Sequence, residues 1–156
     1  AVVFGRAVRP VDEALDIASM VSGVHLAIEI VRSRYVDRSS VGAPSFVADN
    51  SAFHAFVLGD SLPGEWDIGA LQERAVLTRD GVEFASALNG DALTNPASSL
   101  ALFWEHAAQQ GLEIPAGAVV TTGTLTVATD ACDPGQYEAR LGPCRAALKL
   151  VRESAR

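Results

Sequence analysis

The chain has 156 residues, of which 49% are hydrophobic and 20% are charged, and its net charge is −7. This length is sufficient for one compact domain with a substantial core. The acidic balance disfavours nucleic-acid binding, which needs clustered Lys and Arg. No apolar run approaches the roughly 18 residues of a membrane-spanning helix and no secretory leader opens the chain, so we expect a cytoplasmic protein without membrane contact. The positive mean hydropathy of +0.21 hints at apolar surface covered by another subunit, and we therefore expect a homo-oligomer.

The first predicted element is a helix over residues 10–21. Two acidic residues lie in its first turn, and Leu15, Ala18 and Val21 share one stripe. Residues 25–35 and 55–59 follow as strand-like runs. A hairpin is then predicted from residues 74–78 and 82–87, because the Asp80-Gly81 pair between them is typical of a tight turn.

A second helix is predicted after Asn95, which is a good N-cap residue and is followed by Pro96 at the first helical position. Its apolar face contains Leu100, Phe103, Trp104 and Ala107, and Gly111 ends it. Three further strands are predicted over residues 118–122, 136–141 and 145–151. Many short strands with two helices indicate an α+β, mostly β domain with a curved sheet.

The run over residues 25–35 places Glu29 among apolar, β-branched neighbours. A carboxylate taken out of water needs a cation, a metal ion or a proton as its partner. One interpretation is therefore that Glu29 points into a walled cavity. The other is an edge-strand ion pair with Arg32 or Arg34, and spacing alone slightly favours this second interpretation.

Several conventional sites are absent from the sequence. There is no G-x-S-x-G, G-x-G-x-x-G or P-loop motif, so serine-hydrolase, dinucleotide and P-loop functions are unsupported. His25, His54 and His106 are far apart and lack zinc-site spacing. We interpret Cys132 and Cys144 as free, structural thiols.

Five segments of the chain match the motifs of one known family. They are AIEIVRSR at 27–34, VADN at 47–50, AFVLG at 55–59, GDALTNP at 90–96 and AGAVVTTGTL at 116–125. Together they resemble the fumarylacetoacetate hydrolase superfamily, in its branch of 2-hydroxypenta-2,4-dienoate hydratases and 4-oxalocrotonate decarboxylases. The resemblance implies the barrel-like, mixed β fold of that family's C-terminal domain. It extends over essentially the whole chain, so we expect one domain, residues 1–156, that lacks the family's N-terminal region.

The resemblance implies a divalent cation, Mg or Mn, with Glu29 as one ligand. In the family, two more carboxylates in an E-x-E pair complete the metal site, and this pair would lie just ahead of Ala1. Glu29 alone does not hold such a cation, because hard cations of this size need near-octahedral oxygen coordination. We therefore expect the metal only where a preceding or partner segment supplies the pair, and otherwise no cofactor.

The resemblance also indicates catalytic residues. Asp49 and Asn50 are predicted to orient the site through hydrogen bonds, although an Asx loop that caps its own backbone is an equal alternative. Arg34 is a candidate to bind a substrate carboxylate, but we favour a structural pair with Glu29.

Substrate binding is assigned by the same resemblance to Thr122, Gly123 and Thr124, where hydroxyls and close backbone approach suit a small 2-oxo acid. Thr126 stands where relatives usually carry glycine, which predicts a narrowed pocket. His54 replaces a residue that is usually small; we favour a partly buried, hydrogen-bonded imidazole over a new acid–base group.

The leading hypothesis is a metal-dependent hydratase, a lyase that acts on 2-oxo or 2-hydroxy-dienoate acids by tautomerisation and addition of water. Decarboxylation of a vinylogous 2-oxo acid and C–C hydrolysis of an acylpyruvate remain open on the same site. A third hypothesis is a non-catalytic or repurposed member, an assembly partner or a cyclase without metal. The missing acidic pair, His54 and Thr126 favour this third hypothesis.

Overall fold

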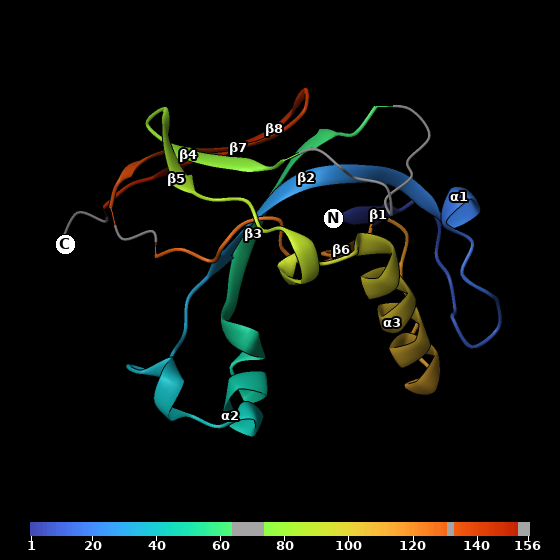
Figure 1. Cartoon of the computed structure of the whole chain (residues 1–156). Coiled ribbons are helices and arrows are strands. Elements are labelled where there is room, and N and C mark those ends of the chain that lie inside the picture. The colour runs from blue at the N-terminus through green and yellow to red at the C-terminus, as the bar shows by residue number, and fades with distance from the viewer. Residues whose placement is uncertain (64–73, 131–132, 153–156) are drawn as a thin grey trace.

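The computed structural model describes residues 1–63, 74–130 and 133–152. Its strands form two four-stranded antiparallel sheets, in the orders β3-β2-β1-β6 and β5-β4-β7-β8 (Figure 1). The prediction of an α+β, mostly β fold is confirmed, and the two sheets do not close into a barrel within the described residues. The strands and helices are β1 Val2–Phe4, α1 Ile17–Met20, β2 Val21–Val31, α2 Ala43–Ala48, β3 Phe53–Ser61, β4 Val76–Arg79, β5 Val82–Ala85, α3 Pro96–Gln109, β6 Val119–Val120, β7 Gly135–Leu141 and β8 Cys144–Leu150.

The first core lies between α3 and the first sheet. Phe4 of β1 is fully buried and stacks on Trp104 of α3, with ring centroids 6.5 Å apart. The helix begins as predicted, because the side chain of Asn95 accepts a hydrogen bond from the N–H of Ser98 at 3.0 Å. The buried residues of this core are Val2, Phe4, Val8, Met20, Val21, Val24, Leu100, Trp104, Ala107 and Ile114.

The second core lies between the two sheets, where β3 packs against β8. Gly59 of β3 permits this approach, because a Cβ there would lie 2.3 Å from the carbonyl oxygen of Arg145. The N–H of Arg145 donates to the Asp60 carboxylate at 3.0 Å and links the same two strands. The buried members of this core are Leu26, Ala75, Ala139, Leu141, Cys144 and Ala146.

The predicted hairpin is confirmed as β4 and β5, joined at Asp80 and Gly81. Both turn residues have positive φ, 50° and 82°, as the two-residue hairpin turn requires. The predicted strands at 118–122, 136–141 and 145–151 correspond to β6, β7 and β8.

The predicted helix over residues 10–21 is wrong in extent, because only Ile17–Met20 is helical. Val21 instead opens β2, where it pairs with Phe4. The strand pairing overrides the helical spacing of the apolar residues, and tertiary pairing commonly decides such ambiguous segments. None of the helices among the described residues is long and apolar enough to span a membrane.

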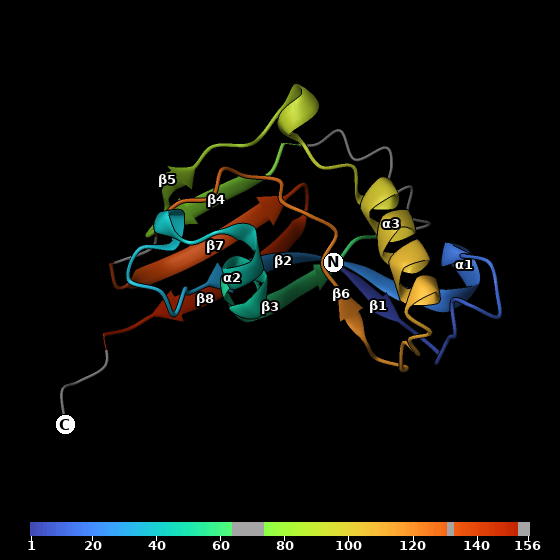
Figure 2. The same cartoon turned by 90° about the horizontal axis from the view of Figure 1, so that it is seen from below.

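Residues 32–52, which include α2, form a lobe beyond the ends of β2 and β3 (Figure 1). In Figure 1 this lobe and α3 lie on the same side of β2, at its two ends, and Figure 2 shows them from below. His54 at the start of β3 is exposed, so the expectation of a partly buried, hydrogen-bonded imidazole is wrong. Cys144 is buried, and its Sγ donates to the carbonyl of Ser61 at 3.5 Å, whereas Cys132 lies outside the described residues.

Candidate functional site

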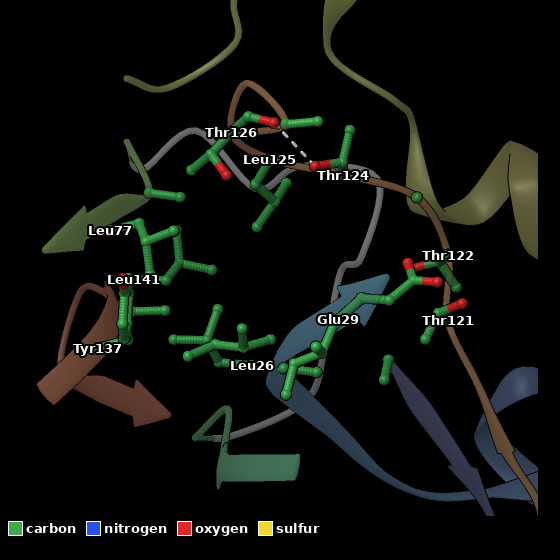
Figure 3. Close-up of a pocket in the computed structure, with 18 of the residues that line it drawn as sticks. Leu26, Glu29, Leu77, Thr121, Thr122, Thr124, Leu125, Thr126, Tyr137 and Leu141 are labelled. Atoms are coloured by element: carbon green, nitrogen blue, oxygen red, sulfur yellow. Dashed lines mark hydrogen bonds between the residues drawn. The ribbon is translucent and has the colours of Figure 1, made fainter. Parts of the chain in front are cut away.

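A cavity of about 430 Å³ lies beside β2 at the junction of the two sheets. It lies alongside residues 26–31 of β2, past the point where Val2 of β1 pairs with Val24. In the described chain, the edge of β2 beyond Leu26 has no strand partner on this side. Residues 121–130 pass along the cavity and form its opposite wall (Figure 3).

Main-chain hydrogen bonds hold this wall in position. The N–H of Leu88 donates to the carbonyl of Leu125, and the N–H of Val127 donates to the carbonyl of Ser86, both at 3.0 Å. The Thr124 hydroxyl donates to the carbonyl of Thr126 at 2.9 Å. The wall is therefore anchored to the segment that follows β5. Residues 121–130 form no regular strand, and their β-type pairing is the isolated bridge between Thr126 and Ala87.

Gly123 turns the wall with a φ of 109°. A Cβ on this residue would lie 2.4–2.8 Å from three side-chain atoms of Thr94, which is much closer than van der Waals contact. Thr94 also lines the cavity. Glycine at position 123 therefore brings the loop before α3 against the wall.

One end of the cavity is polar. Glu29 lines it, and Figure 3 shows the Glu29 side chain extending toward Thr121 and Thr122. Thr122 is buried, with 8% of its surface exposed, whereas Glu29 and Thr121 are exposed. Glu29 forms no ion pair within the described part of the chain.

These positions correct the premise that Glu29 is withdrawn from water. The carboxylate is hydrated, so burial does not force it to take a cation. The predicted pairing with Arg32 or Arg34 is also not formed, because Arg34 pairs with Asp49. Glu29 is instead an accessible carboxylate at the edge of a cavity.

The described lining of the cavity contains neither Lys nor Arg. Among these lining residues there are two carboxylates, Glu29 and Asp130. His25 is its one imidazole in that set, and sequence reasoning missed it because no spacing motif marks it. Its Nδ1 lies 3.0 Å from the carbonyl oxygen of Gly59, so Nδ1 carries the proton and donates.

The other predicted site residues lie elsewhere. Asp49, Asn50 and Arg34 do not line the cavity; they belong to the lobe beyond β2. Nη1 of Arg34 donates to Oδ1 of Asp49 at 2.8 Å and to its carbonyl at 2.7 Å, while the Ser33 hydroxyl donates to Oδ2 at 3.1 Å. Only 2% of the Asp49 side chain is exposed. Thus Thr122, Gly123 and Thr124 accompany Glu29 at the cavity, and the Asp49 cluster does not.

Electrostatics explain how this cluster holds together. The hydrogen bond from Arg34 lowers the pKa of Asp49 below its usual value, and the Ser33 hydroxyl acts in the same direction. The adjoining residues Asn50, Ser51 and Ala52 all have positive φ, between 53° and 61°. Such strain persists only where surrounding contacts fix the backbone, and the clamp on Asp49 supplies these contacts.

The cavity offers carboxylate and hydroxyl oxygens as possible ligands of a divalent cation. Carboxylate and hydroxyl oxygens are suitable in kind for Mg²⁺. Their number is insufficient, because no group of three His, Cys, Asp or Glu that could hold a metal ion occurs among the described residues. The described residues of this chain therefore do not form a divalent-cation site by themselves.

No family model matches the chain. Its relatives include 4-oxalocrotonate decarboxylases from Pseudomonas sp., with 32% identity over 121 residues, and from Pseudomonas putida, with 28% identity over 120 residues. These alignments cover 78% and 77% of this chain but 46% and 45% of the two relatives. The chain thus spans about half the length of the relatives it matches.

Solved structures agree on the fold. The 4-oxalocrotonate decarboxylase from Pseudomonas putida G7 complexed with magnesium and adipate matches with a TM-score of 0.71 and 22% identity, over 94% of this chain and 56% of that one. Its complex with calcium and acetate matches with a TM-score of 0.68. The sequence matches and the shared fold together confirm the resemblance of this chain to the 4-oxalocrotonate decarboxylase branch of the fumarylacetoacetate hydrolase superfamily.

Proposed function

We propose that this chain forms the substrate cavity of a metal-dependent lyase that acts on an unsaturated 2-oxo acid. The observation that carries the proposal is the composition of the cavity: one accessible carboxylate and a row of threonines at one end, apolar walls, and no Lys or Arg among the described lining residues. An anionic substrate therefore finds no positive side chain there. A divalent cation would supply the charge that the lining lacks.

Glu29 is proposed to be one ligand of that cation. The relatives' structures, with magnesium or calcium bound, support a divalent metal in this branch. The register of β1 supports the position: a strand that continued ahead of Ala1 would run alongside residues 26–29 of β2. The acidic pair expected ahead of Ala1 would then lie close to Glu29.

The threonines are proposed to bind the substrate. Thr121 and Thr122 are proposed to donate hydrogen bonds to the carboxylate and 2-oxo oxygens, since Glu29 extends toward them (Figure 3). Gly123 keeps this wall free of a side chain that would displace Thr94. Apolar residues line the rest of the cavity, and substrate binding would displace water from them.

The reaction is proposed to proceed through a dienolate. Its two candidate outcomes are decarboxylation, which the names of the relatives support, and hydration, in which water adds to the distal double bond. The single domain lacking an N-terminal region, the homo-oligomer, and the roles of Asp49 and Asn50 remain predictions. Because Asp49 is clamped by Arg34 outside the cavity lining, we propose that it positions the lobe.

The proposal is tested by titrating Mg²⁺ and Mn²⁺ into the chain as given and into the full product of its gene, by calorimetry. We expect the full product to bind the metal and Glu29→Gln to weaken binding at least tenfold. Glu105→Gln, an exposed acid on α3 away from the cavity, is the matched control and should bind normally. Absence of binding to the full product, or unchanged binding by Glu29→Gln, would refute the proposed metal role.

Activity is measured on the same preparations with 4-oxalocrotonate, by release of CO₂, and with 2-hydroxypenta-2,4-dienoate, by loss of the diene absorbance. We expect turnover of an unsaturated 2-oxo acid that depends on both metal and Glu29. A native full product that binds metal and turns over neither class would favour the non-catalytic hypothesis.

A further inference from the structure

The cavity has two chemically different ends. Glu29, Thr121 and Thr122 lie together at one end, whereas the opposite end is surrounded by leucines from both sheets and by Tyr137 (Figure 3). The apolar residues there include Leu26 of β2, Leu77 of β4 and Leu141 of β7, and two of them belong to the core between the sheets.

Three hydroxyl groups of the cavity lining already donate hydrogen bonds to main-chain carbonyls. The Tyr137 hydroxyl donates to the carbonyl of Asp133 at 2.8 Å. The Thr124 hydroxyl donates to the carbonyl of Thr126, and the Thr129 hydroxyl donates to the carbonyl of Val127 at 3.1 Å. A charged group placed at this end would therefore lose its hydration and gain few donors in return.

The charges of the lining point in the same direction. Among the described lining residues, the carboxylates are Glu29 and Asp130 and there is neither Lys nor Arg, so a second carboxylate on a ligand meets like charge and no guanidinium or lysine ammonium.

We infer that the substrate is a 2-oxo acid that carries a bulky, uncharged hydrocarbon substituent, which occupies the leucine-lined end while the acid group lies at the Glu29 end. This inference rests on the proposed function and specifies its substrate. It separates this chain from an enzyme for small diacids, because a terminal carboxylate would lie where the lining is apolar and acidic.

The test compares three probes by calorimetry on the full gene product with Mg²⁺: 2-oxooctanoate, its equally long diacid 2-oxooctanedioate, and the short 2-oxobutanoate. Each buried methylene contributes roughly fourfold to affinity, so 2-oxooctanoate, with four more methylenes, should bind about two-hundredfold more tightly than 2-oxobutanoate. It should also bind at least tenfold more tightly than the diacid.

Three variants test whether the hydrocarbon substituent binds at the leucine-lined end. Leu77→Lys places a cation at the apolar end. It should weaken the binding of 2-oxooctanoate and strengthen the binding of 2-oxooctanedioate. Val127→Lys makes the same change at an exposed lining position and serves if Leu77→Lys does not fold. Leu102→Lys, exposed on α3 and outside the cavity, is the control and should leave all three affinities unchanged.

The outcomes distinguish this inference from the proposed function. If the diacid bound as tightly as 2-oxooctanoate or more tightly, or if the short acid bound equally well, the inference of a hydrocarbon substituent would be refuted. The proposed 2-oxo acid site would remain intact. Failure of all three acids to bind the metal-loaded protein would overturn the proposed function, and the inference with it.

Discussion

Replacing Gly123 with alanine tests the construction of the cavity wall. The new Cβ would meet three side-chain atoms of Thr94 at 2.4–2.8 Å, against an ordinary carbon–carbon contact of about 3.5–4.0 Å. The wall or Thr94 must therefore move by about 1 Å. Gly123 also has a φ of 109°, a conformation that L-residues rarely adopt.

The expected cost has two parts. Positive φ at a non-glycine residue costs about 1–2 kcal/mol, and overpacking costs about 1–3 kcal/mol, which together give roughly 2–5 kcal/mol for Gly123→Ala. Gly117 offers a matched control, because its φ is 79° and a Cβ there meets nothing within 4 Å. Gly117→Ala should therefore lower the free energy of unfolding only by the conformational cost of about 1–2 kcal/mol.

Urea denaturation measures both free energies of unfolding. A third variant removes the steric part. Thr94→Gly deletes the three atoms nearest to the new Cβ, so adding Gly123→Ala to Thr94→Gly should cost about as much as Gly117→Ala. Gly123→Ala should also weaken 2-oxooctanoate binding more than Gly117→Ala does, because a displacement of about 1 Å disturbs the site. Equal stabilities of the two alanine variants would refute the reasoning about Thr94.

Three further predictions concern the fold around the site. Gly59→Ala should destabilise the protein by about 1–3 kcal/mol in urea, because its Cβ would lie 2.3 Å from the carbonyl oxygen of Arg145; unchanged stability would show that β8 shifts freely. Asn95→Ala should cost about 1 kcal/mol by the same assay through loss of the α3 cap, whereas Asn95→Asp, an equally good cap, should cost little. The bond from Arg34 lowers the pKa of folded Asp49, so its stabilisation is present above the unfolded pKa of about 3.9 and is lost as the pH falls through the lower folded value. The melting temperature of Asp49→Asn should therefore lie below that of the unmodified chain near neutral pH and meet it in strong acid, and a constant difference would contradict the ion pair.

Features encoded by a few adjacent residues could be predicted from the sequence. Asn95 and Pro96 specify the start of α3 by capping chemistry, and the Asp80-Gly81 turn has the positive φ angles that its residues favour. These signals act within one turn of chain, so no knowledge of the rest of the fold is needed.

Features that depend on distant partners could not be predicted in this way. The apolar spacing of residues 10–21 suits a helix, but Val21 pairs with Phe4 and the strand prevails. Arg34 pairs with Asp49, fifteen residues away, because the lobe folds back on itself. The exposure of His54 follows from the absence, among the described residues, of an element that covers that position of β3.

Glu29 shows both a feature that local sequence predicts and one that depends on distant residues. Strand alternation correctly predicts β2, but the environment of its carboxylate depends on residues 121–130, which are distant in sequence and form the opposite wall of the cavity. Glu29 lines this cavity, and its carboxylate remains hydrated. Hydrated Glu29 therefore does not by itself require a positive charge nearby. An acid that enters the cavity does require one, because the described lining has two carboxylates and neither Lys nor Arg.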